Sequence, residues 1–357
     1  MGRTTGAAGT SEPREAHRPR GSDQADESPP TAPGPCGRRR THRRRRALLA
    51  ALITAAVVVP LSGAARPEIP APAPAALAPV TAATLDETYA ANRANAAEAS
   101  RMAAAHGNHE RAAAVRAMAD PSRRFLSYDG RGAGLATEVF GDLAHADRVA
   151  VLVPGSDTSI DTYDRFRDAA RALHERLSRQ APHGTSTAVL AWLGYETPGT
   201  VSTTVTTTDR AEQAAPRLRE FIQQLRAVTG REARVSLLCH SYGSVVCGRA
   251  APHLDVNDIA LVGSPGTGAD SAAALHTRAR VWAARGGADW VAEVPHISLD
   301  LLGTTVGFGT DPVSPAFGAR VFAAGDGGHS DYFRPGSTSL TNLTRIVLGE
   351  TPEVGHG

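Results

Sequence analysis

One stretch, residues 235–251, constrains the fold of this chain most. Three of its first four residues are apolar, residues 239–243 interrupt that pattern, and small and β-branched residues then resume without a turn signal. A buried strand that passes directly into a packed helix has this pattern. Ser241 would lie at the sharp turn between them, which closes only if the residues two positions away are small. Gly243 meets that condition, and Cys239 stands where glycine is usual. The stretch therefore predicts a nucleophile elbow with Ser241 at its tip.

Apolar runs alternate with longer, helix-like runs along most of the chain. We expect strands at 125–128, 135–140, 149–153, 188–193, 235–238, 259–262, 280–283 and 319–323. We expect helices at 84–119, where Gly107 and Asn108 divide the segment in two, and at 160–180, 211–228 and 340–348. The first two strands, joined by a glycine-rich turn, predict a hairpin. This order predicts the α/β class, with a mainly parallel sheet covered by helices on both faces, and the elbow narrows it to an α/β-hydrolase fold.

Charge and composition divide the chain into regions. The chain has 357 residues, 41% of them hydrophobic, which is enough for a sizeable core. Residues 1–46 hold 11 arginines and 5 acidic residues, whereas the remainder holds 27 arginines and 31 acidic residues and is mildly acidic. Nucleic-acid binding is therefore not expected. We expect a disordered basic region at 1–46, an extended Ala/Pro linker at 66–83 and the hydrolase-like domain at 84–350, with a helical segment at 84–119.

Residues 38–65 have the pattern of an export signal. Arginine-rich residues 38–46 precede a short apolar run at 47–59 and a small-residue stretch at 60–65. This is the order of a secretory signal peptide. A membrane-spanning helix needs about 20 apolar residues, and 47–65 approaches that length only with Pro60, Ser62 and Gly63 included. A cleaved signal and an uncleaved anchor with membrane association through 47–65 both stay open, and both place the folded domain outside the cytoplasm.

Two cysteines flank the elbow. Cys239 and Cys247 are eight residues apart across a strand–turn–helix unit in which the chain reverses, so their side chains can face each other. Outside the cytoplasm a disulfide is allowed, and two small buried thiols are the alternative. Cys36 precedes the apolar run and takes no part in this choice.

An elbow serine needs a histidine base, itself oriented by a carboxylate, because a serine hydroxyl is a weak nucleophile. In α/β-hydrolases the acid and then the histidine follow the serine along the chain. We predict His329 as the base, since it lies between the last expected strand and the last expected helix. His253 and His276 fall in or beside helices, and His296 is too close to the acid loop.

Two carboxylates lie between Ser241 and His329 in suitable loops. Asp289 follows the strand at 280–283 and a Gly-Gly turn, at the sheet edge where sites form in parallel sheets. Asp311 is the alternative, although an Asp before proline commonly begins a turn. Asp289 is the predicted acid.

Acyl transfer also needs donors for the developing oxyanion. We predict the backbone N–H of Tyr242, directly after the serine, and that of Ser156, in the loop after the strand at 149–153. Candidate specificity loops are 193–209 and 291–314, of which the second could wall an acyl pocket. No HExxH or CxxC motif occurs, and we expect neither metal nor cofactor.

Four motifs carry a resemblance to a known family. Residues 149–155 (VAVLVPG), the elbow at 240–244, the Asp289 loop and the Gly-His-Ser-Asp-Tyr block at 328–332 resemble an actinobacterial α/β-hydrolase family of unknown function. The resemblance covers roughly residues 84–349 and implies a Ser–Asp–His hydrolase, but no substrate. We expect a secreted or membrane-anchored serine hydrolase that cleaves carboxylic esters, including lipid-like ones. An amide or thioester hydrolase, or a cell-surface binding protein that keeps the fold without turnover, are the alternatives.

Overall fold

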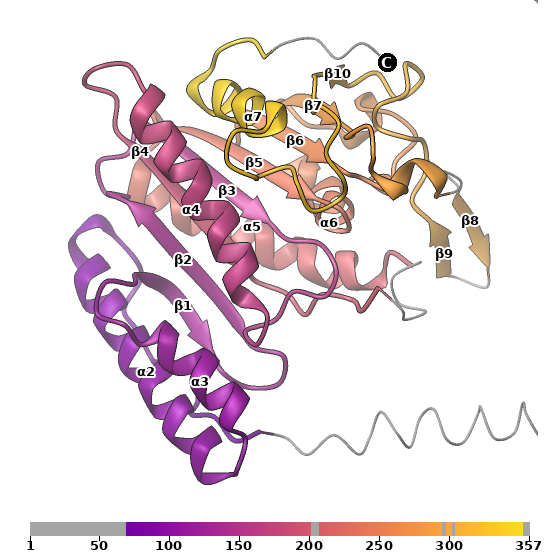
Figure 1. The fold of residues 1–357 in the computed structure, drawn as a ribbon. Helices are drawn as coiled ribbons and strands as arrows, with labels where there is room; N and C mark the ends of the chain where they lie inside the picture. Colours follow the sequence, from indigo (N-terminus) through magenta and orange to yellow (C-terminus); the bar gives the residue numbers. More distant parts are fainter. Residues whose placement is uncertain (1–68, 201–206, 295–297, 302–303, 353–357) are drawn as a thin grey trace, which may run out of the picture. The chain divides into compact units, whose positions relative to one another are not determined.

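Eight strands form the central sheet of the computed structural model, in the order β1-β2-β4-β3-β5-β6-β7-β10 (Figure 1). The structure describes residues 69–200, 207–294, 298–301 and 304–352, all within one compact unit, Pro67–Gly357. The expected basic region 1–46, the export segment 47–65 and the linker up to residue 68 lie outside the described residues and stay predictions. Within the described ranges, no helix is both long and apolar enough to cross a membrane.

The sheet is mainly parallel, as expected. Strands β3 (Arg148–Val153), β4 (Thr187–Leu193), β5 (Arg234–His240), β6 (Asp258–Val262), β7 (Arg280–Ala284) and β10 (Arg320–Val321) pair in parallel. Strands β1 (Phe125–Asp129) and β2 (Leu135–Gly141) form the predicted hairpin, and β2 adds antiparallel to β4. The carboxyl ends of the parallel strands therefore share one edge of the sheet, where loops from distant parts of the chain meet.

Helices cover both faces of the sheet (Figure 1). Helices α4 (Tyr163–Gln180) and α7 (Thr338–Leu348) pack on one face, and α5 (Asp209–Thr229) and α6 (Gly243–Ala250) on the other. Because successive strand residues point to opposite faces, Val149 and Val151 join the core under α5 and α6, whereas Ala150 and Leu152 join the core under α4 and α7. The continuous apolar runs in these strands thus supply two cores.

The helical segment ahead of the sheet is divided as predicted. Helix α2 (Leu85–Ala105) and helix α3 (His109–Met118) are separated at Gly107, whose φ is +84°, and Asn108 caps α3 by accepting the Arg111 N–H. The two helices pack on each other, and α2 lies along the edge strand β1. Short 3-10 turns complete the described elements: η1 (Ala82–Thr84), η3 (Ala251–His253), η4 (Ala273–Leu275) and η5 (Trp290–Glu293).

The structure differs from the sequence-based expectation at several places. Strand β5 continues through Cys239 and His240, so the chain leaves the sheet only at Ser241. Helix α4 begins at Tyr163 rather than at residue 160, because Ser159 and Thr162 hydrogen-bond within a turn before it. A small hairpin, β8 (Ser298–Leu301) and β9 (Thr304–Gly307), was not expected and lies within the candidate loop 291–314.

Candidate active site

Ser241 lies on a strained turn between β5 and α6. Its φ is +54°, in the left-handed region that residues other than glycine seldom adopt. Gly243 makes this turn sterically feasible, because a Cβ there would lie 2.6 Å from the carbonyl oxygens of both Val153 and Pro154. The predicted elbow is therefore present as a backbone geometry, and its tight fit against the end of β3 fixes where the serine lies.

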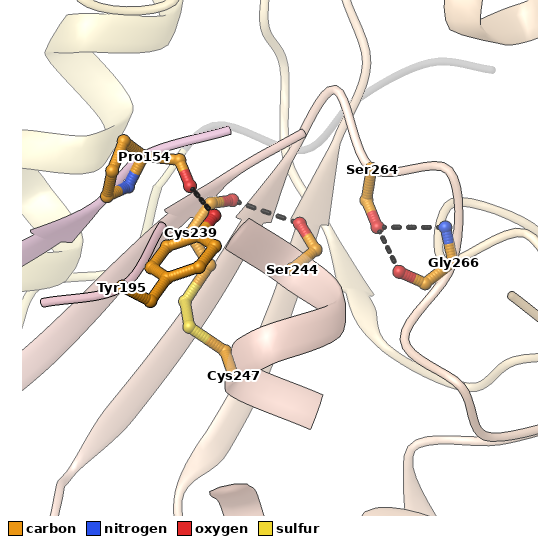
Figure 2. Close-up of a disulfide and its surroundings, with 7 residues drawn as sticks. All are labelled: Pro154, Tyr195, Cys239, Ser244, Cys247, Ser264 and Gly266. Carbon is orange, nitrogen blue, oxygen red and sulfur yellow. Dashed lines mark hydrogen bonds between the residues drawn. A yellow bond between two sulfur atoms is a disulfide. The ribbon is translucent and has the colours of Figure 1, made fainter. Parts of the chain in front are cut away.

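A disulfide joins the two sides of the elbow (Figure 2). Cys239 at the end of β5 and Cys247 in α6 have Cα atoms 6.5 Å apart, and both are fully buried. The sequence left open whether these cysteines form a disulfide or remain two buried thiols, and in the structure they form the disulfide. Ser244 adds a second tie by donating to the Cys239 carbonyl, and Tyr195 donates to the Pro154 carbonyl nearby (Figure 2). Strand β5 and helix α6 are thus joined next to Ser241, and the loop after β3 is held to the segment after β4.

The structure brings Ser241, His329 and Asp289 into one hydrogen-bonded row. Nε2 of His329 lies 2.9 Å from Oγ of Ser241, and Nδ1 lies 2.9 Å from Oδ1 of Asp289. Because an ionised carboxylate only accepts, the Nδ1 position carries the imidazole proton and Nε2 is left to accept the serine proton. These are the contacts that activation of a serine hydroxyl would require.

Asp289, and not Asp311, contacts the histidine. It follows β7 and caps η5, where Oδ1 also accepts the Val291 N–H at 2.9 Å. Burial by itself raises the pKa of the Asp289 carboxyl, but its hydrogen bonds outweigh burial and hold that pKa below its ordinary value. Asp311 instead pairs with Arg285 at 2.6 Å and accepts the Val313 N–H. The two carboxylates that chain order could not separate thus have different partners in space.

Two residues next to this row were missed by sequence reasoning. His240, directly before the serine, donates from Nε2 to the His329 carbonyl at 2.7 Å, and the two rings lie 4.7 Å apart. Tyr332, in the same block as His329, places its hydroxyl 2.5 Å from Oδ2 of Asp289. Both residues stood inside motifs that the sequence already singled out. Their contacts were not foreseeable because each depends on how strand ends meet across the sheet.

Both predicted oxyanion donors lie beside the serine. Gly155 brings the loop after β3 against the nucleophile, since a Cβ there would lie 2.6 Å from Cβ of Ser241. Among the described residues, none accepts a hydrogen bond from the backbone N–H of Ser156 or of Tyr242. The Tyr242 side chain points elsewhere and donates to the Thr207 carbonyl. The two N–H groups are therefore available for an external acceptor, and their role as an oxyanion hole stays a prediction.

A cavity of about 550 Å³ opens over the serine. Its walls are mostly apolar, with aromatic side chains from four separate segments: Phe166, Trp290, Phe308 and Phe333. Val291 and Val294, from the second candidate loop, also line it, whereas His296 of that loop lies outside the described residues. Trp290 is 52% exposed and its ring lies 4.7 Å from that of His329, at the rim of the site. The cavity therefore offers a mostly apolar surface to a ligand that reaches Ser241.

Within the described ranges, no three His, Cys, Asp or Glu side chains are grouped so that they could hold a metal ion. The arrangement at Ser241 needs only the hydroxyl, the imidazole and the carboxylate for its chemistry.

The class of protein is that of the α/β-hydrolases. It follows from the strand order of the sheet, from the strained backbone at Ser241 and from the hydrogen-bonded row of Ser241, His329 and Asp289. Residues 129–299 match the model of a family described as Alpha/beta hydrolase. The matched stretch includes Ser241 and Asp289, and His329 lies beyond its end. Together with the fold, the match confirms the α/β-hydrolase resemblance that the motifs predicted.

The relatives are mycobacterial proteins without an assigned function. An uncharacterized protein of Mycobacterium tuberculosis is 30% identical over 247 residues, which is 61% of this chain and 37% of that protein. An uncharacterized protein of Mycobacterium bovis is 33% identical over 141 residues, 37% of this chain and 53% of that protein. The match thus spans little more than a third of the length of the first relative. These matches fit the predicted actinobacterial family of unknown function.

Similar solved structures include the esterase PE8, at 17% identity with a TM-score of 0.40. That similarity covers 60% of this chain and 97% of that one. A serine hydrolase without lid from Xanthomonas campestris has 17% identity and a TM-score of 0.38, and the similarity covers 64% of this chain and 93% of that one.

Proposed function

We propose that this protein is a serine hydrolase that cleaves carboxylic esters outside the cytoplasm. The observation that supports the proposal most is the row of hydrogen bonds from Asp289 through His329 to Ser241, at the floor of an apolar cavity. A non-catalytic binding protein would have no need of a strained serine, and a strained residue persists only where the surrounding structure holds it.

In the proposed reaction, Oγ of Ser241 attacks the acyl carbon while its proton passes to Nε2 of His329. The oxygen that becomes negative accepts hydrogen bonds from the N–H groups of Ser156 and Tyr242. His329 then gives the proton to the departing alcohol, which leaves an acyl–serine ester. Water, deprotonated by His329, cleaves that ester and releases the carboxylic acid and the free serine. Asp289 stays ionised throughout and stabilises the imidazolium.

A fluorophosphonate probe tests the nucleophile, because it labels only an activated serine. Wild-type protein should be labelled and should hydrolyse p-nitrophenyl esters, and Ser241→Ala should lose both while its melting temperature changes little. Ser178→Ala, which removes an exposed hydroxyl on α4, is the matched control and should behave as wild type. Labelling without ester turnover would direct the search to amides and thioesters. Unlabelled wild-type protein would contradict the enzyme and favour the binding protein.

The carboxylate is tested by a pair of substitutions. Asp289→Asn should lower turnover by up to about ten-thousandfold, because the amide imposes the wrong imidazole tautomer. Asp311→Asn should cost far less, since Asp311 pairs with Arg285 rather than with His329. A damaging Asp311→Asn beside a nearly silent Asp289→Asn would reverse the acid assignment but leave the hydrolase proposal intact.

The location outside the cytoplasm rests on the export pattern at 38–65 and agrees with a disulfide at the elbow, because disulfides persist in oxidising compartments. A reporter fused behind residues 1–65 should be exported, and a fusion that lacks 38–65 should stay in the cytoplasm. Sequencing the amino terminus of the exported protein distinguishes a start near Arg66 from an uncleaved anchor.

A further inference from the structure

Tyr332 has a hydrogen-bonding position that the proposed reaction leaves without a role. Its side chain is only 3% exposed, and its hydroxyl donates to Oδ2 of Asp289 at 2.5 Å. The same hydroxyl accepts the Gly286 N–H at 3.0 Å, in the turn between β7 and Asp289. One phenol therefore holds both the carboxylate and the loop that carries it.

The Asp289 carboxylate divides its two oxygens between different partners. Oδ1 accepts from Nδ1 of His329 and from the Val291 N–H, while Oδ2 accepts from Tyr332. The Asp289 side chain is closed to solvent, so water does not replace a missing donor there. Without the phenol, Oδ2 would be a buried, charged oxygen with no hydrogen bond, which proteins rarely tolerate.

Gly263, after β6, allows this close packing. Its φ is +56°, and a Cβ there would lie 2.8 Å from Oδ2 of Asp289, 2.8 Å from the Tyr332 ring and 3.1 Å from Nδ1 of His329. Three side chains from two loops, the Asp289 loop and the loop that holds His329 and Tyr332, thus converge on a position where only glycine fits. The carboxylate has little room to rotate away from the histidine as long as the phenol stays in place.

We propose that Tyr332 is a positioning residue, which holds the Asp289 carboxylate in the orientation that directs His329 toward Ser241. The proposal rests on the proposed function, because it concerns the efficiency of the same row. Tyr332 does not touch the serine or the acyl group in this role and acts only through Asp289.

The proposed role of Tyr332 predicts the direction in which the pH profile of kcat/KM shifts when its hydroxyl is removed. A donated hydrogen bond stabilises the ionised carboxylate and spreads part of its charge onto the phenol. Without that bond, more of the negative charge of Asp289 faces the imidazole and stabilises its protonated form. The acid limb of the kcat/KM profile should therefore move to higher pH. Loss of simple packing at Tyr332 would lower the rate without moving the limb.

Tyr332→Phe is the test variant, since it keeps the ring and removes only the hydroxyl. The second-order rate of fluorophosphonate labelling and kcat for a p-nitrophenyl ester should both fall by about tenfold to a hundredfold, as expected for one lost hydrogen bond to a charged group. KM should change little, because the ring that lines the cavity remains. Tyr128→Phe is the control: it also removes a buried hydroxyl, one that has no hydrogen-bond partner among the described residues, and its rates should match wild type.

A double-mutant cycle with Asp289→Asn separates positioning from other effects. If Tyr332 acts through the carboxylate, Tyr332→Phe should be nearly silent in the Asp289→Asn background. Equal losses in both backgrounds would overturn the proposal, as would a Tyr332→Phe variant with wild-type rate and pH profile. Rates are referred to the folded fraction measured by circular dichroism. Absent labelling of the wild-type protein would instead contradict the proposed function itself.

Discussion

At the scale of single residues, the surroundings of Ser241 shift the pKa values of His240 and Asp289. His240 is the clearest case, because its surroundings desolvate the ring and the nearby His329 adds to the effect. Together they lower the pKa of His240 from 6.5 to about 4. The neutral ring can then keep its Nε2 proton on the His329 carbonyl throughout the range in which an esterase would work.

His240 should therefore make the folding free energy depend on pH. As pH falls below about 6.5, His240 of the unfolded chain takes up a proton that the folded chain refuses until about pH 4, so stability is lost over that interval. The loss from this one residue is at most about 3 kcal/mol by pH 4. Urea unfolding at pH 7.5 and pH 4.5 measures it. His240→Gln, which keeps a donor but does not titrate, should show a smaller decrease, and an equal decrease in both proteins would refute the assignment. Burial also lowers the pKa of His174. Because both proteins contain His174, its contribution to the decrease cancels in the comparison.

At the scale of elements, the site depends on two glycines that let the end of β3 approach the elbow. Gly243 clears the carbonyl groups at that end, and Gly155 clears the serine itself. The disulfide and the Ser244 hydrogen bond then fix α6 to β5. The position of Ser241 thus results from close backbone packing between β3, β5 and α6.

Gly155→Ala should abolish most activity without unfolding the protein. The new methyl group would lie 2.6 Å from Cβ and 3.2 Å from Oγ of Ser241, so either the serine or the loop with the Ser156 N–H must shift. Misplacement of about 1 Å at a reactive centre costs roughly a hundredfold in rate.

Gly107→Ala is the control variant. Its new Cβ would meet no atom within 4 Å, but the φ of +84° at this position strains an alanine. It should lower the melting temperature and leave kcat unchanged. If Gly155→Ala keeps the wild-type kcat, the loop after β3 can accommodate the methyl group without displacing Ser241, and the prediction is wrong.

At the scale of the whole domain, a buried ion cluster joins the edge hairpin to the helical layer. Glu138 of β2 is 2% exposed and accepts two hydrogen bonds from Arg123, at 2.8 and 2.7 Å. Arg167 of α4 adds a third at 3.2 Å. The carboxylate therefore ties β2 to α4 and to the segment that follows α3, on the side of the sheet away from the disulfide.

Glu138→Gln should destabilise the domain by about 3 kcal/mol or more, because it leaves buried guanidinium charge without its counterion. Glu175→Gln removes one partner of an exposed pair with Arg171 on α4 and should cost about 0.5 kcal/mol or less. Chemical unfolding of the two variants gives the comparison. Ester turnover per folded molecule should be unchanged in both, and equal stabilities would contradict the importance of the buried cluster.

The sequence by itself determined the strands and helices of the main sheet and their order, although not the small β8–β9 hairpin. Strand and helix follow from local periodicity and from small residues at fixed positions, which is why the hairpin, the break at Gly107 and the turn at Ser241 were all foreseen. It also placed Asp289 and His329 in loops at the correct edge of the sheet, because strand ends can be read locally. Their catalytic roles, like those of Ser156 and Tyr242, remain predictions.

Only the tertiary structure decided which of these residues meet. His329 contacts Asp289 across 40 residues of sequence and Ser241 across 88, and Tyr332 reaches Asp289 across 43. Such contacts depend on strand order and on the packing of loops at one sheet edge, which no local pattern encodes. For the same reason chain order left Asp311 open, spacing left the Cys239–Cys247 bond open, and neither showed that one phenol holds the carboxylate.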